Sequence, residues 1–113
     1  MKPFILYHWS PMKNRKQILK YGLRPGSLSR CKQWKPPYIC FSKSPSMAWG
    51  LSANMDKRKI EWDLWMVWSS VLDGYETLST DGSGRPTEYR TYHRIYKRDI
   101  WYVGTRAYIP RAS

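Results

Sequence analysis

Three short stretches of the sequence hold side chains that could do chemistry together. The first is Leu6-Tyr7-His8-Trp9-Ser10, where an imidazole and a hydroxyl stand two residues apart at the end of an apolar run. On a strand, residues two apart point to the same face, so His8 and Ser10 could both be aimed at a ribose or an amide. The alternative is a half-buried His8 satisfied by a neighbouring carbonyl.

The second stretch runs from Tyr38 to Trp49 and reads Tyr-Ile-Cys-Phe-Ser-Lys-Ser-Pro-Ser-Met-Ala-Trp. It places the end of a strand, several hydroxyls and the start of a helix that bears an aromatic residue within one turn. The N-terminus of such a helix suits an anion or a polar ring edge. The alternative is a plain connection from strand to helix, with Tyr38 and Trp49 in the core.

The third stretch, Gly82-Ser-Gly-Arg-Pro-Thr-Glu88-Tyr-Arg90, places a single carboxylate at the start of a strand, just after a glycine-rich turn. The surrounding sequence is otherwise rich in cations. Glu88 and Arg90 share one face of that strand. The alternative is a surface ion pair, which contributes little to stability.

The elements that must position these stretches follow from apolar patterning and from capping residues. Strands are predicted at 3–9, 38–42, 60–69, 87–95 and 99–105, and the segment 60–69 shows the clearest two-residue alternation. Ser10-Pro11 predicts a helix start with Ser10 as N-cap, and Gly22 predicts its end. Ser44-Pro45 predicts the start of a second helix. This order indicates one α+β domain over residues 1–113.

The composition excludes several classes of protein. No apolar run approaches the ~20 residues of a membrane span, and the N-terminal apolar stretch is too short for a secretory signal. We therefore expect a cytoplasmic protein without membrane contact. Cys31 and Cys40 are compatible with reduced thiols. Together with His8 and His93 they lack zinc-finger spacing, so no metal site is expected.

The charge is strongly and unevenly positive. The chain carries a formal net charge of +12, and ten Lys or Arg residues precede the first acidic residue, Asp56. Such a surface attracts phosphate backbones or acidic protein faces. We therefore expect a nucleic acid or an acidic protein surface as partner. The cations chosen as contacts are Arg24, Arg30, Lys32, Lys35, Arg90 and Arg94.

Taken in serial order, the three stretches resemble a known family. The chain reads Tyr7-His8-Trp9-Ser10, then Ile18-Leu-Lys-Tyr-Gly-Leu-Arg-Pro-Gly26, then a strand closing in Phe41-Ser42, and last Glu88-Tyr-Arg90. This order is similar to the diphtheria-toxin-like branch of the ADP-ribosyltransferases, with its His–Tyr–Glu motif on three strands. The resemblance implies split antiparallel sheets with two helices, and NAD as the substrate that supplies ADP-ribose.

The resemblance also implies roles for individual residues. His8 would hold a ribose hydroxyl of NAD, and Ser10 the carboxamide, with Ser42 nearby. Glu88 would bond the nicotinamide ribose and stabilise the positive charge that develops as nicotinamide leaves. Cys40 stands where the family has its tyrosine, which leaves Tyr38 or Trp49 to stack on the nicotinamide ring.

Three functions compete at this point. One is a mono-ADP-ribosyltransferase that modifies a nucleic acid or a nucleic-acid-associated protein. Another is a non-enzymatic basic binder on the same scaffold, because residues 89–98 interleave cations with aromatic rings as stacking platforms do. The third is an inhibitor of another protein, of the kind that phages or mobile elements encode.

Overall fold

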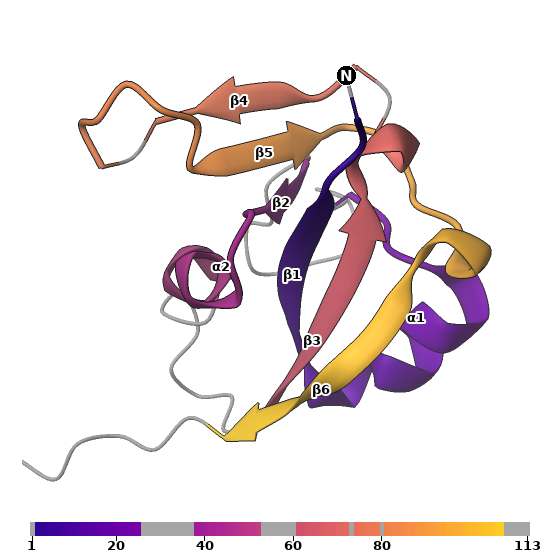
Figure 1. Ribbon diagram of the computed structural model, residues 1–113. Helices are drawn as coiled ribbons and strands as arrows, with labels where there is room; N and C mark the ends of the chain where they lie inside the picture. Colours follow the sequence, from indigo (N-terminus) through magenta and orange to yellow (C-terminus); the bar gives the residue numbers. More distant parts are fainter. Residues whose placement is uncertain (1, 26–37, 53–60, 73, 80, 108–113) are drawn as a thin grey trace, which may run out of the picture.

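The computed structural model describes residues 2–25, 38–52, 61–72, 74–79 and 81–107, which form two antiparallel three-stranded sheets and two short α-helices (Figure 1). The first sheet has the order β1 (Ile5–Pro11), β3 (Glu61–Trp68), β6 (Trp101–Ala107). The second has the order β2 (Ile39–Phe41), β5 (Glu88–Thr91), β4 (Glu76–Leu78). The predicted α+β class is confirmed.

One pair of backbone hydrogen bonds joins the two sheets. The amide of Tyr7 donates to the carbonyl of Ser42 at 2.8 Å, and the amide of Ser42 donates to the carbonyl of Tyr7 at 3.0 Å. The middle of β1 is therefore held beside the end of β2. Residues far apart in the sequence meet at this junction, and the candidate site lies there.

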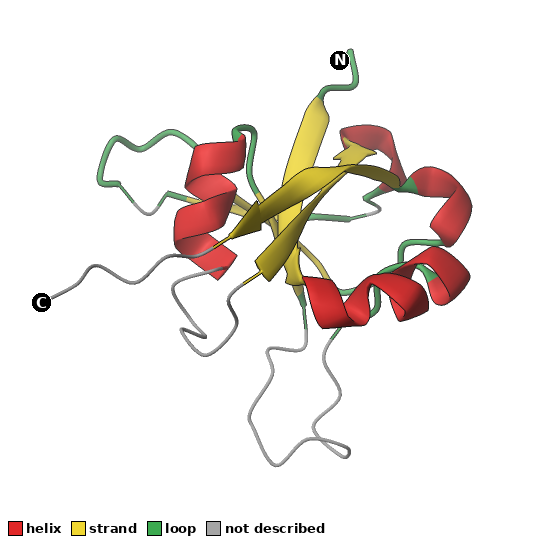
Figure 2. Cartoon of the chain, turned by 90° about the horizontal axis from the view of Figure 1, so that it is seen from below, coloured by secondary structure: helices red, strands yellow, loops and turns green. Residues whose placement is uncertain are grey.

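The first sheet lies between the two helices, because its strands are apolar on both faces (Figures 1 and 2). One face, with Leu6 and Trp65, joins the main core together with Ile18 of α1 (Arg15–Tyr21) and residues of the second sheet such as Phe41. The opposite face packs a smaller core against α2 (Pro45–Ser52). Each face of β1 thus meets a different environment.

The predicted start of the first helix at Ser10-Pro11 is wrong. Both residues belong to β1, where Ser10 pairs with Asp63 of β3. A 3₁₀ turn, Met12–Asn14, follows, and α1 begins only at Arg15. Of the described strands only β3 pairs with this end of β1, so proline, which lacks an N–H, is tolerated there. The predicted end is confirmed, because the Gly22 amide donates to the Ile18 carbonyl at 2.7 Å.

The second predicted helix is confirmed, and Ser44 caps it by accepting the amide of Met47 at 3.1 Å. The strand predicted at 60–69 matches β3 closely. The strand predicted at 87–95 ends earlier, at Thr91, because Ile95 instead bridges to Leu23 beyond α1. The short β4 was not predicted from the sequence.

Within the described segments, neither helix is both long and apolar enough to cross a lipid bilayer.

Candidate functional site

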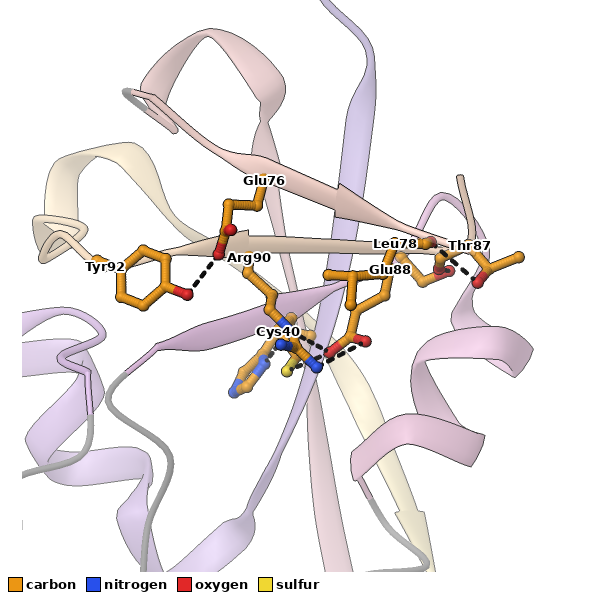
Figure 3. Close-up of polar contacts among 9 residues, drawn as sticks. Cys40, Glu76, Leu78, Thr87, Glu88, Arg90 and Tyr92 are labelled. Atoms are coloured by element: carbon orange, nitrogen blue, oxygen red, sulfur yellow. Dashed lines mark hydrogen bonds and ion pairs between the residues drawn. The ribbon is translucent and has the colours of Figure 1, made fainter. Parts of the chain in front are cut away.

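Cys40 links two of the predicted site residues. Its backbone carbonyl lies 2.7 Å from Nδ1 of His8 on β1, and its thiol donates a hydrogen bond of 2.9 Å to Oε1 of Glu88 on β5. The three residues come from three different strands, and β2 is the element between the other two. Figure 3 shows Cys40 and Glu88 facing each other, with Arg90 beside them. The geometry thus brings His8 and Glu88 to opposite ends of one residue.

Glu88 is a buried carboxylate that accepts hydrogen bonds from Arg90 as well as from Cys40. Only 4% of the residue is exposed. Nε of Arg90 donates to its Oε1 at 3.0 Å, and Nη2 of Arg90 donates to its Oε2 at 3.3 Å. The ion pair proposed from the sequence exists, but it is not a surface pair. Burial removes the hydration of this carboxylate, and the hydrogen bonds from the arginine compensate for that loss.

The thiol of Cys40 stays protonated beside this carboxylate. Burial raises the pKa of Cys40 far above its usual value, and the hydrogen bond to Glu88 and the charge of Glu88 raise it further. A thiol in that state is neither a nucleophile nor a metal ligand at neutral pH. Cys40 therefore acts here as a hydrogen-bond donor.

His8 is neutral in this environment. Burial lowers the pKa of His8, against an opposing effect from its hydrogen bond to the Cys40 carbonyl. A carbonyl only accepts, so Nδ1 carries the proton and donates to it. In this tautomer Nε2 has a lone pair and is a hydrogen-bond acceptor. The alternative of a half-buried histidine satisfied by a carbonyl therefore describes one ring nitrogen and leaves the other for chemistry.

Aromatic rings border the arginine of this cluster. The guanidinium of Arg90 lies 4.1 Å from the ring centre of Tyr38, and Tyr38 in turn meets Tyr92 edge to face. The phenol of Tyr92 donates to Glu76 of β4 (Figure 3). Burial raises the pKa of Tyr38, with a further contribution from Cys40. Among the predicted stacking residues, Tyr38 is thus the one tied to Glu88 through Arg90.

The two predicted serines, Ser10 and Ser42, are both buried but lie in different surroundings. Ser42 donates its hydroxyl to the carbonyl of Thr87 at 2.9 Å, directly before Glu88 in the chain. It thereby fixes the start of β5. Ser10 shares a face of β1 with His8 but lies opposite Asp63, two positions farther along the strand pair.

Trp49 contributes to the second core. Its ring meets those of Trp9 and Trp62 edge to face, and the guanidinium of Arg106 lies 4.2 Å from its ring centre. Trp9 faces the side of β1 opposite His8. The alternative of a core tryptophan fits these contacts.

The predicted contact cations divide into three groups. Arg90 pairs with Glu88, as described above. Arg94 and Arg24 both lie near Tyr21 at the end of α1. Arg30, Lys32 and Lys35 lie outside the described residues.

From the sequence, Cys40 was only the residue that replaces the family's tyrosine. Its hydrogen bonds to both His8 and Glu88 were not predicted. Its two-residue offset from Ser42, on the same strand face, was the available signal. Thr87 was also missed: its amide and its hydroxyl both donate to the Leu78 carbonyl, at 2.8 Å and 3.3 Å, and so attach the start of β5 to β4.

No group of three or more His, Cys, Asp or Glu side chains within the described part of the chain could hold a metal ion. Comparison of the sequence with protein-family models and with curated proteins, and of the chain with solved structures, found no match.

Proposed function

We propose that this chain is an NAD-dependent mono-ADP-ribosyltransferase built on split antiparallel sheets, and that its acceptor is a nucleic acid or a protein bound to nucleic acid. The observation that carries the proposal is the hydrogen-bonded series His8–Cys40–Glu88 across β1, β2 and β5. The order of these residues in the chain is that of the His–Tyr–Glu transferases. The bridge between Tyr7 and Ser42 fixes their spacing.

His8 supplies an acceptor for a ribose hydroxyl. With Nδ1 held as a donor to the Cys40 carbonyl, the ring presents Nε2 as a lone pair, and a ribose hydroxyl donates to it. The lowered pKa of His8 keeps the ring neutral, so binding does not depend on losing a proton at neutral pH.

Glu88 supplies the negative charge for the reaction. The carbon–nitrogen bond between ribose and nicotinamide breaks, nicotinamide leaves as a neutral molecule with the bonding electrons, and positive charge develops on the ribose. A fixed carboxylate stabilises that charge more in the transition state than in the ground state. The acceptor then attacks the same carbon and loses one proton, so that the products are ADP-ribosylated acceptor, nicotinamide and a proton.

The Cys40 thiol occupies the position at the Glu88 carboxylate that a ribose hydroxyl takes when NAD binds. A thiol is a weak hydrogen-bond donor, so a ribose hydroxyl that displaces it from Oε1 of Glu88 gains a stronger bond. Arg90 holds both oxygens of the carboxylate and keeps its orientation during that exchange. Tyr38, next to Arg90, is the ring that we assign to the nicotinamide side of the site.

A non-enzymatic binder on the same scaffold is the second candidate. The observation that favours it is that Glu88 already has a cation on both of its oxygens, as a purely structural carboxylate would. In that case Glu88 contributes to the fold and the basic surface carries the function.

Transfer of label from NAD distinguishes the transferase from the non-enzymatic binder. Protein is incubated with NAD labelled in its adenylate phosphate and with a cell lysate divided into protein, RNA and DNA fractions. The wild type should transfer label to one fraction, and Glu88→Gln, which removes the charge at nearly constant volume, should lower the rate at least about 100-fold. Arg85→Gln, in an exposed turn, is the matched control and should leave the rate unchanged. Transfer that is equal in Glu88→Gln and the wild type, or absent from both, contradicts the proposal.

A further inference from the structure

A second surface, separate from the Glu88 site, combines two exposed tyrosines with cations at the end of α1. Tyr21 is 39% exposed and Tyr96 is 49% exposed. Both rings have two cations near them. The surface, here called the tyrosine patch, consists of Lys20, Tyr21, Arg24, Arg94, Tyr96 and Arg98.

The backbone brings the two halves of the tyrosine patch together. Leu23 and Ile95 exchange two hydrogen bonds of 2.9 Å, and Nη2 of Arg94 donates to the carbonyl of Tyr21 at 2.9 Å. In Figure 1, α1 and the turn that precedes β6 lie on the same side of the first sheet. Residues about seventy positions apart in the sequence thus form one surface.

Gly22 is the residue that allows this approach. Its φ of +82° is in the left-handed region, and a Cβ at this position would lie 2.0 Å from the carbonyl oxygen of Ile95 and 2.9 Å from the amide of Lys97. Only glycine fits such a contact without displacing backbone. The tyrosines are therefore held in a fixed relation to each other by main-chain packing.

The positions of the cations around the two tyrosines favour a polyanion that itself carries exposed aromatic rings, such as unpaired bases. Lys20 Nζ lies 5.1 Å and Arg24 Cζ 5.2 Å from the ring centre of Tyr21. Around Tyr96 the corresponding distances are 4.8 Å for Arg94 and 5.3 Å for Arg98. Asp99, at 3.8 Å from Arg98, is the acidic residue that meets this group among the described ion pairs. Phenol rings beside several cations suit unpaired bases together with their phosphates.

We infer that the tyrosine patch binds single-stranded nucleic acid, with bases stacked on Tyr21 and Tyr96 and phosphates contacted by Arg24 and Arg94. A duplex presents its phosphates but keeps its bases stacked on one another, so it uses the cations alone. The identification of this strand as the acceptor rests on the proposed transferase function, whereas its binding is independent of NAD.

Fluorescence anisotropy with labelled oligonucleotides, in the absence of NAD, tests the inference. The probes are a 12-nucleotide thymidine strand, a 12-nucleotide uridine strand and a DNA duplex of the same length. The full chain should bind both single strands more tightly than the duplex. Tyr21→Ala and Tyr96→Ala should each weaken single-strand binding about 5- to 150-fold and leave duplex binding almost unchanged, since stacking is lost and charge is kept. Trp68→Ala, which removes an exposed ring at the end of β3, is the control and should have no effect.

The salt dependence tests the cations separately. Arg24→Gln and Arg94→Gln should each reduce the slope of log affinity against log salt by about 0.7 on a single strand. Arg85→Gln should leave the slope unchanged. Gly22→Ala, where circular dichroism shows that it is folded, should weaken single strands more than the duplex because it separates the two rings.

The inference is overturned if neither single strand binds at about 100 μM protein in low salt, if Tyr21→Ala and Tyr96→Ala match Trp68→Ala, or if the duplex binds as tightly as the single strands. Such a result leaves the NAD assignment standing, because no NAD enters this measurement. Equally, a wild type that binds the single strands but transfers no label from NAD contradicts the transferase alone.

Discussion

Two buried carboxylates of this protein, Asp63 and Glu88, differ in the partners that donate hydrogen bonds to them. Asp63 on β3 accepts from Arg15 on both oxygens, at 2.9 Å and 2.7 Å, and from Thr105 of β6 at 2.7 Å. Glu88 accepts from Arg90, two residues along the same strand, and from a thiol. Both have a bidentate arginine, but that of Asp63 attaches α1 to β3, whereas that of Glu88 lies on the same strand.

A structural ion pair differs from a candidate for chemistry in how far along the chain its arginine lies. Asp63 is 0% exposed, and its partners come from positions 42 and 48 residues away, so its bonds close long loops of chain. The pair between Glu88 and Arg90 closes no such loop. It holds the carboxylate at the sheet junction beside Cys40, where we propose that it serves the reaction.

The largest expected difference between the two carboxylates concerns stability. Asp63→Asn should lower the free energy of unfolding by about 3 kcal/mol, because it removes the charge that accepts from Arg15 and leaves Thr105 with a weaker acceptor. Glu88→Gln should lower it by about 1 kcal/mol, since the amide still accepts from the thiol. Urea unfolding followed by circular dichroism measures both. Equal losses in the two variants would break the comparison.

Acid unfolding should reveal the structural role of Asp63. Burial opposes the ionisation of Asp63, but hydrogen bonds from Arg15 and Thr105 outweigh it, so the pKa of Asp63 in the folded state is lowered. A carboxyl with a lowered folded pKa stabilises the fold above its unfolded value, about 3.9, and this stability is lost as the pH falls through the folded value. Stability should therefore fall as the pH drops below about 5, and Asp63→Asn should flatten this fall. An unchanged profile in Asp63→Asn would contradict the structural role.

Protonation of His8 should affect stability at higher pH. Burial lowers the pKa of His8 in the folded state, so the unfolded chain binds a proton more readily below about pH 6.5. Stability should decrease as the pH falls from about 7 to 5, and His8→Gln should remove part of that decrease. Nuclear magnetic resonance of the His8 ring should show it neutral, with its proton on Nδ1. A protonated ring at pH 6 would rule out the acceptor role of Nε2.

The smallest expected effect is on thiol reactivity. In a Cys31→Ser background, Cys40 should react slowly with iodoacetamide, since burial and the bond to Glu88 raise the pKa of Cys40. Glu88→Gln removes the neighbouring charge and should speed the reaction severalfold. Asp63→Asn, measured without urea at a temperature where it is folded, should not change the rate. The rate is read from mass spectrometry of the intact protein. Identical rates in both variants would mean that Glu88 does not act on Cys40.

Local patterns predicted much of this fold. The two-residue alternation in β3 and the Ser44-Pro45 helix start are properties of neighbouring residues, and both were found. The start of α1 was missed because Ser10 and Pro11 carry a strong local helix signal that pairing with β3 overrides. β4 is three residues long and depends on pairing with β5, which no local pattern reports.

The candidate site shows the same division. His8 and Glu88 were selected from their residue types and serial order, but their common neighbour Cys40 depends on the register of β2 with β5 and on the bridge between the sheets. Trp49 packs against the second core, and its place beside a ligand stays a prediction. Aromatic residues serve cores and ligands equally well, so only the three-dimensional arrangement distinguishes them.

The most direct test of the account is a titration of ¹⁵N-labelled protein with NAD, followed through backbone amide shifts. Binding at the sheet junction predicts the largest shifts around His8, Cys40 and Glu88, with little change around Asp63 and Thr105. Glu88→Gln should weaken the titration without changing which amides respond. Shifts concentrated around Asp63, or no shifts up to about 5 mM NAD, the weak limit of specific binding, would contradict the central claim that Glu88 is the functional carboxylate.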